Sequence, residues 1–172
     1  MSNVTVVPYS PEWPAHFGAL REELLGVFTP VPAVVEHIGS TSVPGLAAKP
    51  VIDVLLGARS LGDIELKIGP LSRLGYAYVT KYEREIPMRR YFVKPAGTSP
   101  RVHLHAVAVD SRLWREHLAF RDMLRADPDL RSTYEALKLR LAAEHAQDKA
   151  AYTSAKGGFI QSVLSAAGLE AG

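Results

Sequence analysis

The segment Val51-Ile52-Asp53-Val54-Leu55-Leu56 is the most apolar strand-like stretch in this sequence of 172 residues. A nearly continuous apolar run predicts a central strand whose two faces are both covered. Asp53 is therefore the residue that needs an explanation, because an ionised carboxylate in such a strand is costly without a cation or hydrogen-bond donors. The alternative is a structural aspartate that backbone amides satisfy at the end of the strand.

The hydrophobic pattern on either side of this segment predicts an α+β or α/β chain with a mixed sheet. Further strands are expected over Val4–Tyr9, Ala33–Ile38, Tyr76–Tyr82, Arg89–Lys94 and Arg101–Val109. Helices are expected over Glu12–Phe28, Leu61–Leu74, Arg112–Arg125, Asp127–Tyr152 and Gly158–Ala167. No repeat or low-complexity linker interrupts the pattern. We therefore expect one domain over residues 1–172, with a sheet-containing part over 1–110 and a helical tail over 111–172.

Composition is that of an ordinary globular domain, with 47% apolar and 22% charged residues. The absence of cysteine excludes disulfides, thiolate metal sites and cysteine nucleophiles, and leaves His, Asp and Glu as possible metal ligands. No secretory signal is visible, and no apolar run approaches the roughly 20 residues that span a bilayer. We therefore expect a cytoplasmic protein without membrane contact. A net charge of +2 is too small to predict a nucleic-acid partner, so RNA or DNA binding is the weakest of the functions considered.

The stretch HIGSTSVPGLAAKPVIDV at residues 37–54 resembles the signature of the GrpB family. Four later blocks agree with that family in order: IPMRRYF at 86–92, HLH at 103–105, HLAFRD at 117–122 and AYTSAK at 151–156. The resemblance therefore extends over nearly the whole chain. The family is grouped by resemblance with the nucleotidyltransferase superfamily, which implies a mixed β-sheet with helices packed on it.

Nucleotidyltransferases place a Gly-Ser turn at the start of a short helix, where backbone N–H groups and a hydroxyl hold a triphosphate. A strand about a dozen residues later presents two carboxylates at i and i+2, and a neighbouring strand adds a third, so that two divalent cations are held. Gly39 and Ser40 followed by Asp53 reproduce the first part of this pattern. The second part fails, because Leu55 stands where the second carboxylate is required.

His103 and His105 stand two residues apart on the strand where the third acid would be expected, so they share one face. One carboxylate with one or two imidazoles suits a single transition-metal ion better than paired Mg²⁺. We predict Asp53, His103 and His105 as ligands of a divalent metal (Mg²⁺, Mn²⁺ or Zn²⁺), with Asp53 and His105 as the catalytic residues. The alternative is that both histidines are half-exposed strand residues that pair with their neighbours.

Hydroxyl and basic side chains supply the predicted contacts to an anionic ligand. Taken alone, the 39–42 turn fits an ordinary helix cap better, and the family blocks around it are what favour phosphate binding. Arg89 and Arg90 are consecutive on a strand, so at most one of them points into a site, and a solvated strand edge is the alternative. The predicted substrate-binding set is Gly39, Ser40, Thr41, Ser42, Lys49, Arg89, Arg90, Arg121 and Lys156. His37 is a further candidate for ligand contact, whereas His117 and His145 are expected to be structural.

Two functions are compatible with these residues. The first is transfer of a nucleotidyl group from a nucleoside triphosphate to a small acceptor, with Gly39, Ser40 and Lys49 on the phosphates, Asp53 on a metal and His105 as metal ligand or base. The second is a module that binds a nucleotide or another phosphorylated metabolite without chemistry. GrpB-like regions fused to dephospho-CoA kinase imply, by resemblance, an accessory role near coenzyme A synthesis. Acceptor, nucleotide preference and protein partner stay open.

Overall fold

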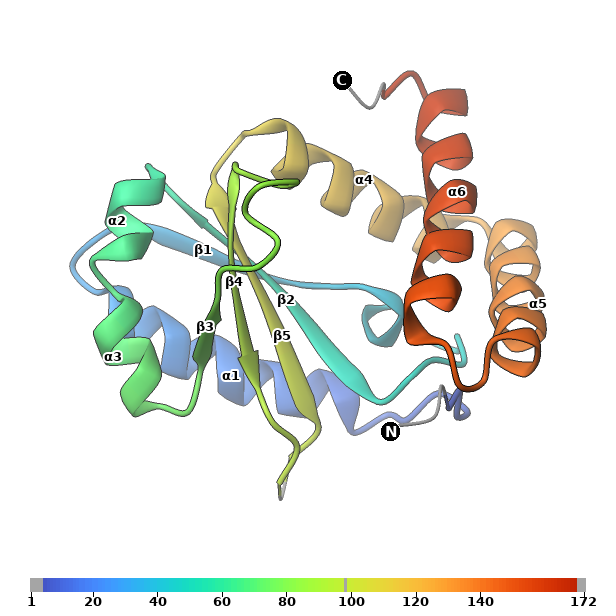
Figure 1. Cartoon of the computed structure of the whole chain (residues 1–172), viewed down its shortest axis with the longest axis horizontal. Coiled ribbons are helices and arrows are strands. Elements are labelled where there is room, and N and C mark those ends of the chain that lie inside the picture. Colours follow the sequence, from blue (N-terminus) through green and yellow to red (C-terminus); the bar gives the residue numbers. More distant parts are fainter. Residues whose placement is uncertain (1–4, 98, 170–172) are drawn as a thin grey trace.

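The computed structural model describes residues 5–97 and 99–169. Its centre is a five-stranded sheet in the order β1-β2-β5-β4-β3, with helices on both faces (Figure 1). The strands are β1 (Ala33–Ile38), β2 (Val51–Ala58), β3 (Ala77–Val79), β4 (Arg89–Lys94) and β5 (Arg101–Ala108). β2 and β5 run parallel, and the other neighbouring strands run antiparallel, so the sheet is mixed.

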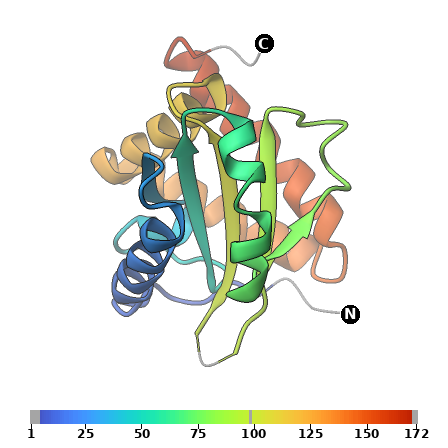
Figure 2. The same ribbon diagram turned by 90° about the vertical axis from the view of Figure 1, so that its left-hand side faces the viewer.

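One face of the sheet is covered by α1 (Trp13–Phe28), α2 (Leu61–Glu65) and α3 (Ile68–Arg73). Figure 2 shows α2 and α3 in front of the sheet and the C-terminal helices behind it. Alternate residues of the strands point to this face and form the main core with side chains of the three helices. The strands contribute Ile52, Val54, Leu56, Val102 and Leu104, and the helices contribute Leu24, Phe28, Ile64 and Leu71.

The second face carries α4 (Arg112–Ala126), with α5 (Pro128–Glu144) and α6 (Lys149–Ala166) packed beside it. Trp114 of α4 joins Ile38, Leu55 and Val107 in a second cluster of buried side chains. A Cβ atom on Gly57 would stand 2.7 Å from Trp114 Cζ3, so the absence of a side chain at 57 lets the indole lie directly on β2. The expectation that β2 is covered on both faces is confirmed.

Helix α5 makes hydrogen bonds to both backbone groups of Ala47, which lies in the segment that leads into β2. Glu135 Oε1 accepts a hydrogen bond from Ala47 N at 2.7 Å, and Lys138 Nζ donates to Ala47 O. Lys138 is only 1% exposed, and burial lowers its pKa to about 7. Its Nζ also lies 5.0 Å from the ring centroid of Tyr134. The helical tail is therefore attached to the segment that precedes Asp53.

Three expectations in the first half of the chain are wrong in their extent. The strand expected over Tyr76–Tyr82 is confined to the three residues of β3, and turns follow it. The strand expected over Val4–Tyr9 is a single isolated bridge between Val7 and Ala48, and residue 4 lies outside the described residues. The helix expected over Leu61–Leu74 is divided into α2 and α3. Two glycines and a proline in that stretch, at 62, 69 and 70, have poor helix propensity, which favours the interruption.

The helices of the tail also divide differently from the prediction. The helix expected over Asp127–Tyr152 ends at Glu144, and the one expected over Gly158–Ala167 is the second half of α6. Asp148 explains the new boundary, because its side chain accepts a hydrogen bond from Ala151 N and caps the start of α6. A cap within a continuous helical pattern was the missed signal.

Candidate functional site

Three adjacent strands present polar side chains on the face that α4 partly covers. Asp53 of β2 stands opposite His103 of β5, and Tyr91 of β4 stands opposite His105 of β5. Leu104, between the two histidines, points into the main core on the other face. The structure thus brings the predicted residues Asp53, His103 and His105 together.

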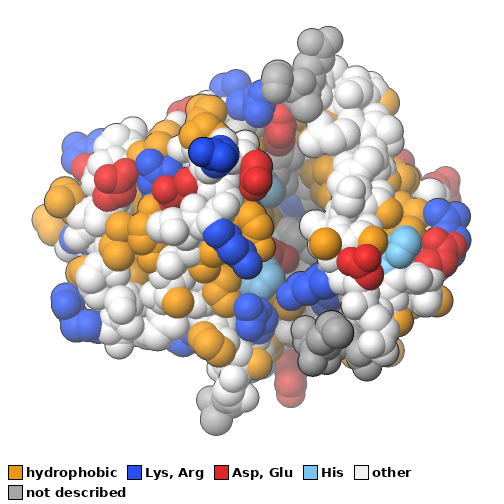
Figure 3. All heavy atoms as spheres, in the orientation of Figure 1, with side chains coloured by type: hydrophobic (Ala, Val, Ile, Leu, Met, Phe, Trp, Pro, Cys, Tyr) orange, Lys and Arg blue, Asp and Glu red, His pale blue; other side chains and the backbone are white. Residues whose placement is uncertain are grey.

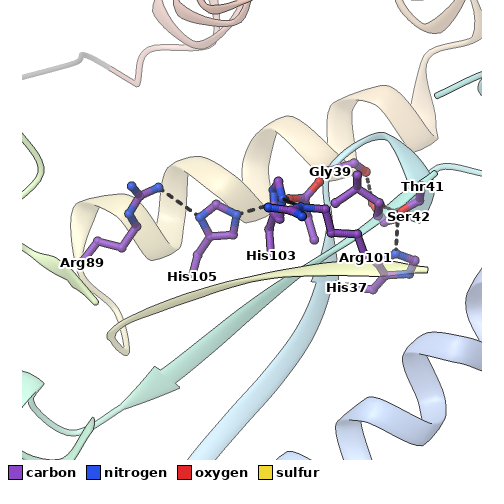
Figure 4. Close-up of polar contacts among 10 residues, drawn as sticks. His37, Gly39, Thr41, Ser42, Arg89, Arg101, His103 and His105 are labelled. Carbon is purple, nitrogen blue, oxygen red and sulfur yellow. Dashed lines mark hydrogen bonds and ion pairs between the residues drawn. The ribbon is translucent and has the colours of Figure 1, made fainter. Parts of the chain in front are cut away.

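The two histidines approach the same oxygen of Asp53. His105 Nε2 lies 3.3 Å from Asp53 Oδ1, and His103 Nδ1 lies 3.7 Å from it. An arginine contacts the far nitrogen of each imidazole: Arg89 Nη1 lies 3.1 Å from His105 Nδ1, and Arg101 Nε donates to His103 Nε2 at 3.1 Å. Figure 4 shows Arg89, His105, His103 and Arg101 in one row along the sheet.

The other oxygen of Asp53 faces the turn that begins the short 3₁₀ helix η1 (Ser40–Ser42). Gly39 has a φ of 73°, a region that glycine adopts without penalty. A Cβ atom at this position would stand 2.5 Å from Asp53 Oδ2, so the backbone of Gly39 is in direct contact with the carboxylate. Glycine is required here both for the backbone conformation and for the close approach.

Two hydroxyls of the turn are used inside the protein. Thr41 donates to Val51 O at 2.9 Å, and Ser42 donates to Gly39 O. Both side chains are buried, whereas Ser40 is half-buried and its hydroxyl contacts that of Tyr134 on α5. Thr41 and Ser42 were predicted to contact the ligand, but the contacts that they make here support the turn itself.

His37 also supports the turn and does not reach the site face. Its Nε2 lies 3.0 Å from Thr41 Oγ1, and its ring stacks on Phe17 of α1 with centroids 4.8 Å apart. Burial lowers the pKa of His37 to about 4, so the imidazole is neutral at physiological pH. The ligand contact considered for His37 is not supported by this position.

Lys49 and Lys156 lie against the same aromatic ring on the tail side of the site. Their Nζ atoms are 4.9 Å and 5.5 Å from the ring centroid of Tyr152. Neither ammonium group has a hydrogen-bond or ion-pair partner among the residues that the structure describes. Burial lowers the pKa of both, to about 8 for Lys49, while attraction to Asp53 opposes this effect. Both were predicted as anion contacts.

The remaining predicted arginines are engaged elsewhere. Arg90 pairs with Glu65 of α2 at 3.2 Å, on the face opposite to Asp53, as strand alternation predicts. Arg121 of α4 pairs with Glu36 of β1 at 2.9 Å and also donates to His37 O, so it fastens α4 to the edge of the sheet. Of the predicted arginines, Arg89 is the one whose guanidinium contacts the cluster around Asp53.

Sequence analysis missed three residues of the site. Arg101 and Tyr91 each stand two positions from a residue already predicted, so strand alternation would have placed them on the same face. His117 of α4 was expected to be structural, yet its ring centroid is 5.6 Å from that of His105, and burial lowers its pKa to about 3. Its place depends on how α4 crosses the sheet, which no spacing in the sequence predicts.

Asp53 is ionised in this environment. Burial by itself raises its pKa, but the hydrogen bond with His105 and the attraction to His105, His103 and Lys156 outweigh burial and hold the pKa below that of a free aspartate. Burial lowers the pKa of His103 to about 4 against the attraction of Asp53. At neutral pH a single carboxylate therefore faces a neutral imidazole at His103, with cationic side chains around it.

The position of the missing second carboxylate lies beneath α4. Leu55 is fully buried and packs with Ile38, Val107 and Trp114. A carboxylate there would be enclosed by hydrocarbon, which is costly without a cation or donors. Leucine at position 55, in place of a second carboxylate, therefore matches the packing of α4 on this face of the sheet.

Within residues 5–97 and 99–169, no group of three or more His, Asp or Glu side chains is arranged to hold a metal ion. The imidazole nitrogens of His103 and His105 that face the arginines are engaged as acceptors. The donor set does not fit a metal ion in this arrangement. Ligation by Asp53, His103 and His105 stays a prediction.

The surface over this cluster is hollowed. Figure 3 shows a furrow between the sheet-containing part and the helices α5 and α6, with histidine side chains in its floor and Lys or Arg side chains on both sides. Acidic side chains also stand at its rims (Figure 3). The Lys and Arg side chains along the furrow are the groups that could contact an anionic small molecule.

The model of the GrpB protein family matches residues 3–166. The chain belongs to the GrpB family. The UPF0157 protein YqkA of Bacillus subtilis is 36% identical over 158 residues, which cover 92% of this chain and 45% of that protein. A dephospho-CoA kinase of Mycolicibacterium paratuberculosis is 34% identical over 176 residues, which cover 89% of this chain and 43% of the kinase. The chain thus spans less than half the length of these two relatives.

Solved structures confirm the fold. The crystal structure of GrpB from Enterococcus faecalis has a TM-score of 0.84 and 35% identity, and the match covers 95% of this chain and 96% of that one. A cytoplasmic RNA terminal U-transferase has a TM-score of 0.62 at 16% identity, over 92% of this chain and 50% of that one. This GrpB-family chain therefore has a nucleotidyltransferase-like fold. None of its described helices combines the length and apolar character needed to cross a membrane.

Proposed function

We propose that this GrpB-family protein binds a nucleoside triphosphate in the furrow above Asp53 and transfers its nucleotidyl group to a small acceptor. The contact between Gly39 and Asp53 Oδ2 is the observation that carries this proposal. It sets an ionised carboxylate directly beside the turn that, in nucleotidyltransferases, holds the phosphates. The fold and the turn are the parts of such an enzyme that this chain retains.

The lysines on Tyr152 support an anionic ligand. A partly buried ammonium without an acceptor loses hydration that nothing in the protein replaces. Lys49 and Lys156 are both in this position, and phosphate oxygens would supply acceptors to them. Ser40, which follows Gly39 at the start of η1, is a further hydroxyl that a phosphate could bind in place of its contact with Tyr134. We assign the triphosphate to this side of the furrow.

The proposed reaction uses Asp53 as the base. The proton of the acceptor hydroxyl moves to Asp53 Oδ2, the acceptor oxygen forms a bond to the α-phosphorus, and the bond to pyrophosphate breaks. Lys49 and Lys156 offset the negative charge that gathers on the departing pyrophosphate. A positioned general base contributes about 10²- to 10⁴-fold to such a step.

Release of pyrophosphate from the purified protein tests this proposal, with each of the common nucleoside triphosphates and a broad panel of acceptors. Asp53→Asn is expected to reduce turnover by about 10²-fold or more, while binding of the triphosphate persists. Asp63→Asn is the matched control, because Asp63 is an acid of α2 that pairs with Arg59 away from the site. Absence of pyrophosphate release with every donor and acceptor would sink the proposed transfer.

A second candidate is a binding module that holds a nucleotide or another phosphorylated metabolite without transfer. Leu55 favours it, because the site has a single carboxylate where the superfamily uses a pair. Similarity to a dephospho-CoA kinase suggests coenzyme A or its precursor as ligands. Thermal-shift titrations with ATP, GTP and CoA separate the candidates, since stabilisation without pyrophosphate release favours the module.

A further inference from the structure

The arginines determine which nitrogen of each site histidine carries a proton. A guanidinium has N–H donors and no acceptor, so the imidazole nitrogen that it contacts must be the acceptor. Arg89 Nη1 lies 3.1 Å from His105 Nδ1, which makes Nδ1 the unprotonated nitrogen. The proton of His105 is therefore on Nε2, the nitrogen that lies 3.3 Å from Asp53 Oδ1.

In His103 the two ring nitrogens have exchanged roles, but an N–H group again faces Asp53. Arg101 Nε donates to His103 Nε2, so the proton of His103 is on Nδ1, which lies 3.7 Å from Asp53 Oδ1. The two imidazoles are thus opposite tautomers that turn their N–H groups toward one carboxylate oxygen. Free neutral histidine favours the proton on Nε2, so His103 is held in the less common form.

We infer that His105 and His103 are positioning residues for Asp53, leaving Oδ2 as the oxygen that meets the ligand without a resident metal ion. The N–H group of His105 is hydrogen-bonded to Oδ1, and that of His103 faces the same oxygen at 3.7 Å as an electrostatic contact. The identity of that ligand rests on the proposed function, but the arrangement of donors does not. Asp53 replaces His105 as the base, because both nitrogens of His105 are occupied by Arg89 and Asp53.

A metal ion shared with Asp53 would need the reverse arrangement. Each imidazole would have to turn a lone pair toward Asp53 and carry its proton on the nitrogen that faces an arginine. The N–H of the imidazole would then point at the N–H of the arginine, and neither could accept a hydrogen bond. Histidines that ligate metals normally donate their other N–H to an acceptor, whereas here the outer partner of each is a donor. Arg89 is also held in place, with its guanidinium carbon 4.5 Å from the ring centroid of Tyr91.

Fixing one oxygen determines where the other one lies. With Oδ1 hydrogen-bonded to the N–H of His105 and faced by that of His103 at 3.7 Å, the carboxylate resists rotation, and Oδ2 stays against the backbone of Gly39. The free oxygen therefore lies where the turn would place a ligand's phosphate groups and the acceptor bound beside them. Rigid support of the reacting group is what a well-organised site requires.

Side-chain ¹⁵N NMR of the full chain tests this inference directly. Long-range ¹H–¹⁵N correlation spectra at neutral pH are expected to show a protonated Nε2 for His105 and a protonated Nδ1 for His103. Signals are assigned by their loss in His103→Gln and His105→Gln. Arg101→Met is expected to release His103 to the Nε2–H form, whereas Arg140→Met, at an exposed arginine that pairs with Glu144 on α5, should leave both tautomers unchanged.

Addition of one equivalent of Zn²⁺ or Mn²⁺ completes the test. Unchanged imidazole signals of the wild type support the inference. A protonated Nε2 on His103, or His103 and His105 signals that shift stoichiometrically with the metal, would overturn it. If a variant does not fold, the wild-type spectrum is sufficient to decide the question. No substrate is present in these spectra, so failure of the proposed transfer in the pyrophosphate assay is a separate result.

Discussion

Replacing Gly39 with alanine perturbs the contact on which the site depends. The added Cβ would stand 2.5 Å from Asp53 Oδ2 and 2.9 Å from Asp53 Cβ, whereas ordinary contacts begin at 3.4 Å. The carboxylate or the turn must therefore move by roughly 0.9 Å, the difference between 3.4 and 2.5 Å. Asp53 is held on its other side by His105, and the turn is held by the hydrogen bond from Thr41 to Val51 O, so either movement strains an existing interaction.

Gly45→Ala is the matched control, because Gly45 belongs to the same loop. Its φ of 83° is also positive, but nothing lies within 4 Å of its added Cβ. Gly39, with a ψ of −177°, lies in a region that is almost exclusive to glycine, where strain costs about 1–3 kcal/mol. Overpacking adds about 1–3 kcal/mol at Gly39 alone. Gly39→Ala should therefore lose about 1–3 kcal/mol more than Gly45→Ala, which is about 2–12 °C in Tm for a domain of this size.

Urea unfolding and thermal melts measure this difference, and the same two variants are titrated with ATP. Gly39→Ala should also weaken any stabilisation by ATP, since the shifted carboxylate enters the space of the ligand, while Gly45→Ala should retain it. Equal stability of the two variants, within about 0.5 kcal/mol, would show that the contact between Gly39 and Asp53 does not form in solution.

Three further predictions concern buried groups and the packing of α4. Burial holds the pKa of His37 at about 4 against 6.5 for the free side chain. Its contribution to the free energy of unfolding is therefore complete above pH 6.5 and is lost as the pH falls toward 4. His37→Gln should remove up to about 3 kcal/mol of that acid sensitivity in urea titrations at pH 7.5 and 4.5. Lys138 has a folded pKa of about 7, so the unfolded chain binds more protons above that pH, and the free energy of unfolding should rise from pH 7 to 9. Lys138→Met should reduce that slope, and an unchanged slope would contradict the assignment. Gly57→Ala should cost about 1–3 kcal/mol, because its Cβ would meet the Trp114 ring at 2.7 Å. The smaller side chain in Trp114→Leu should make the double variant more stable than additivity predicts, and a strictly additive cycle would refute this contact.

Strand alternation accounts for what the sequence could predict about the site. Asp53, His103 and His105 occupy positions of like parity on two paired strands, so their common face follows once β2 and β5 are neighbours. The same rule separates Arg89 from Arg90, which pairs with Glu65 behind the sheet. These predictions need the period of a strand and the family's order of strands, and no detail of packing.

Interactions between distant segments account for what could not be predicted. His117 reaches His105 only because α4 crosses the sheet above it. The buried side chain of Leu55 is explained by Trp114, which is 59 residues later in the chain. Thr41 carries a hydroxyl suited to a ligand, but it bonds to Val51 O, and nothing in the local sequence distinguishes the two uses.

The two hydrogen bonds that α5 makes to Ala47 give the protein a built-in reporter. The amide hydrogen of Ala47 is bonded to the carboxylate of Glu135, so it exchanges with deuterium only when that carboxylate moves away. The exchange rate at this one position therefore measures how often the contact between α5 and the loop opens. A ligand that bridges the two sides of the furrow should slow that exchange, even when no bond in the ligand is broken.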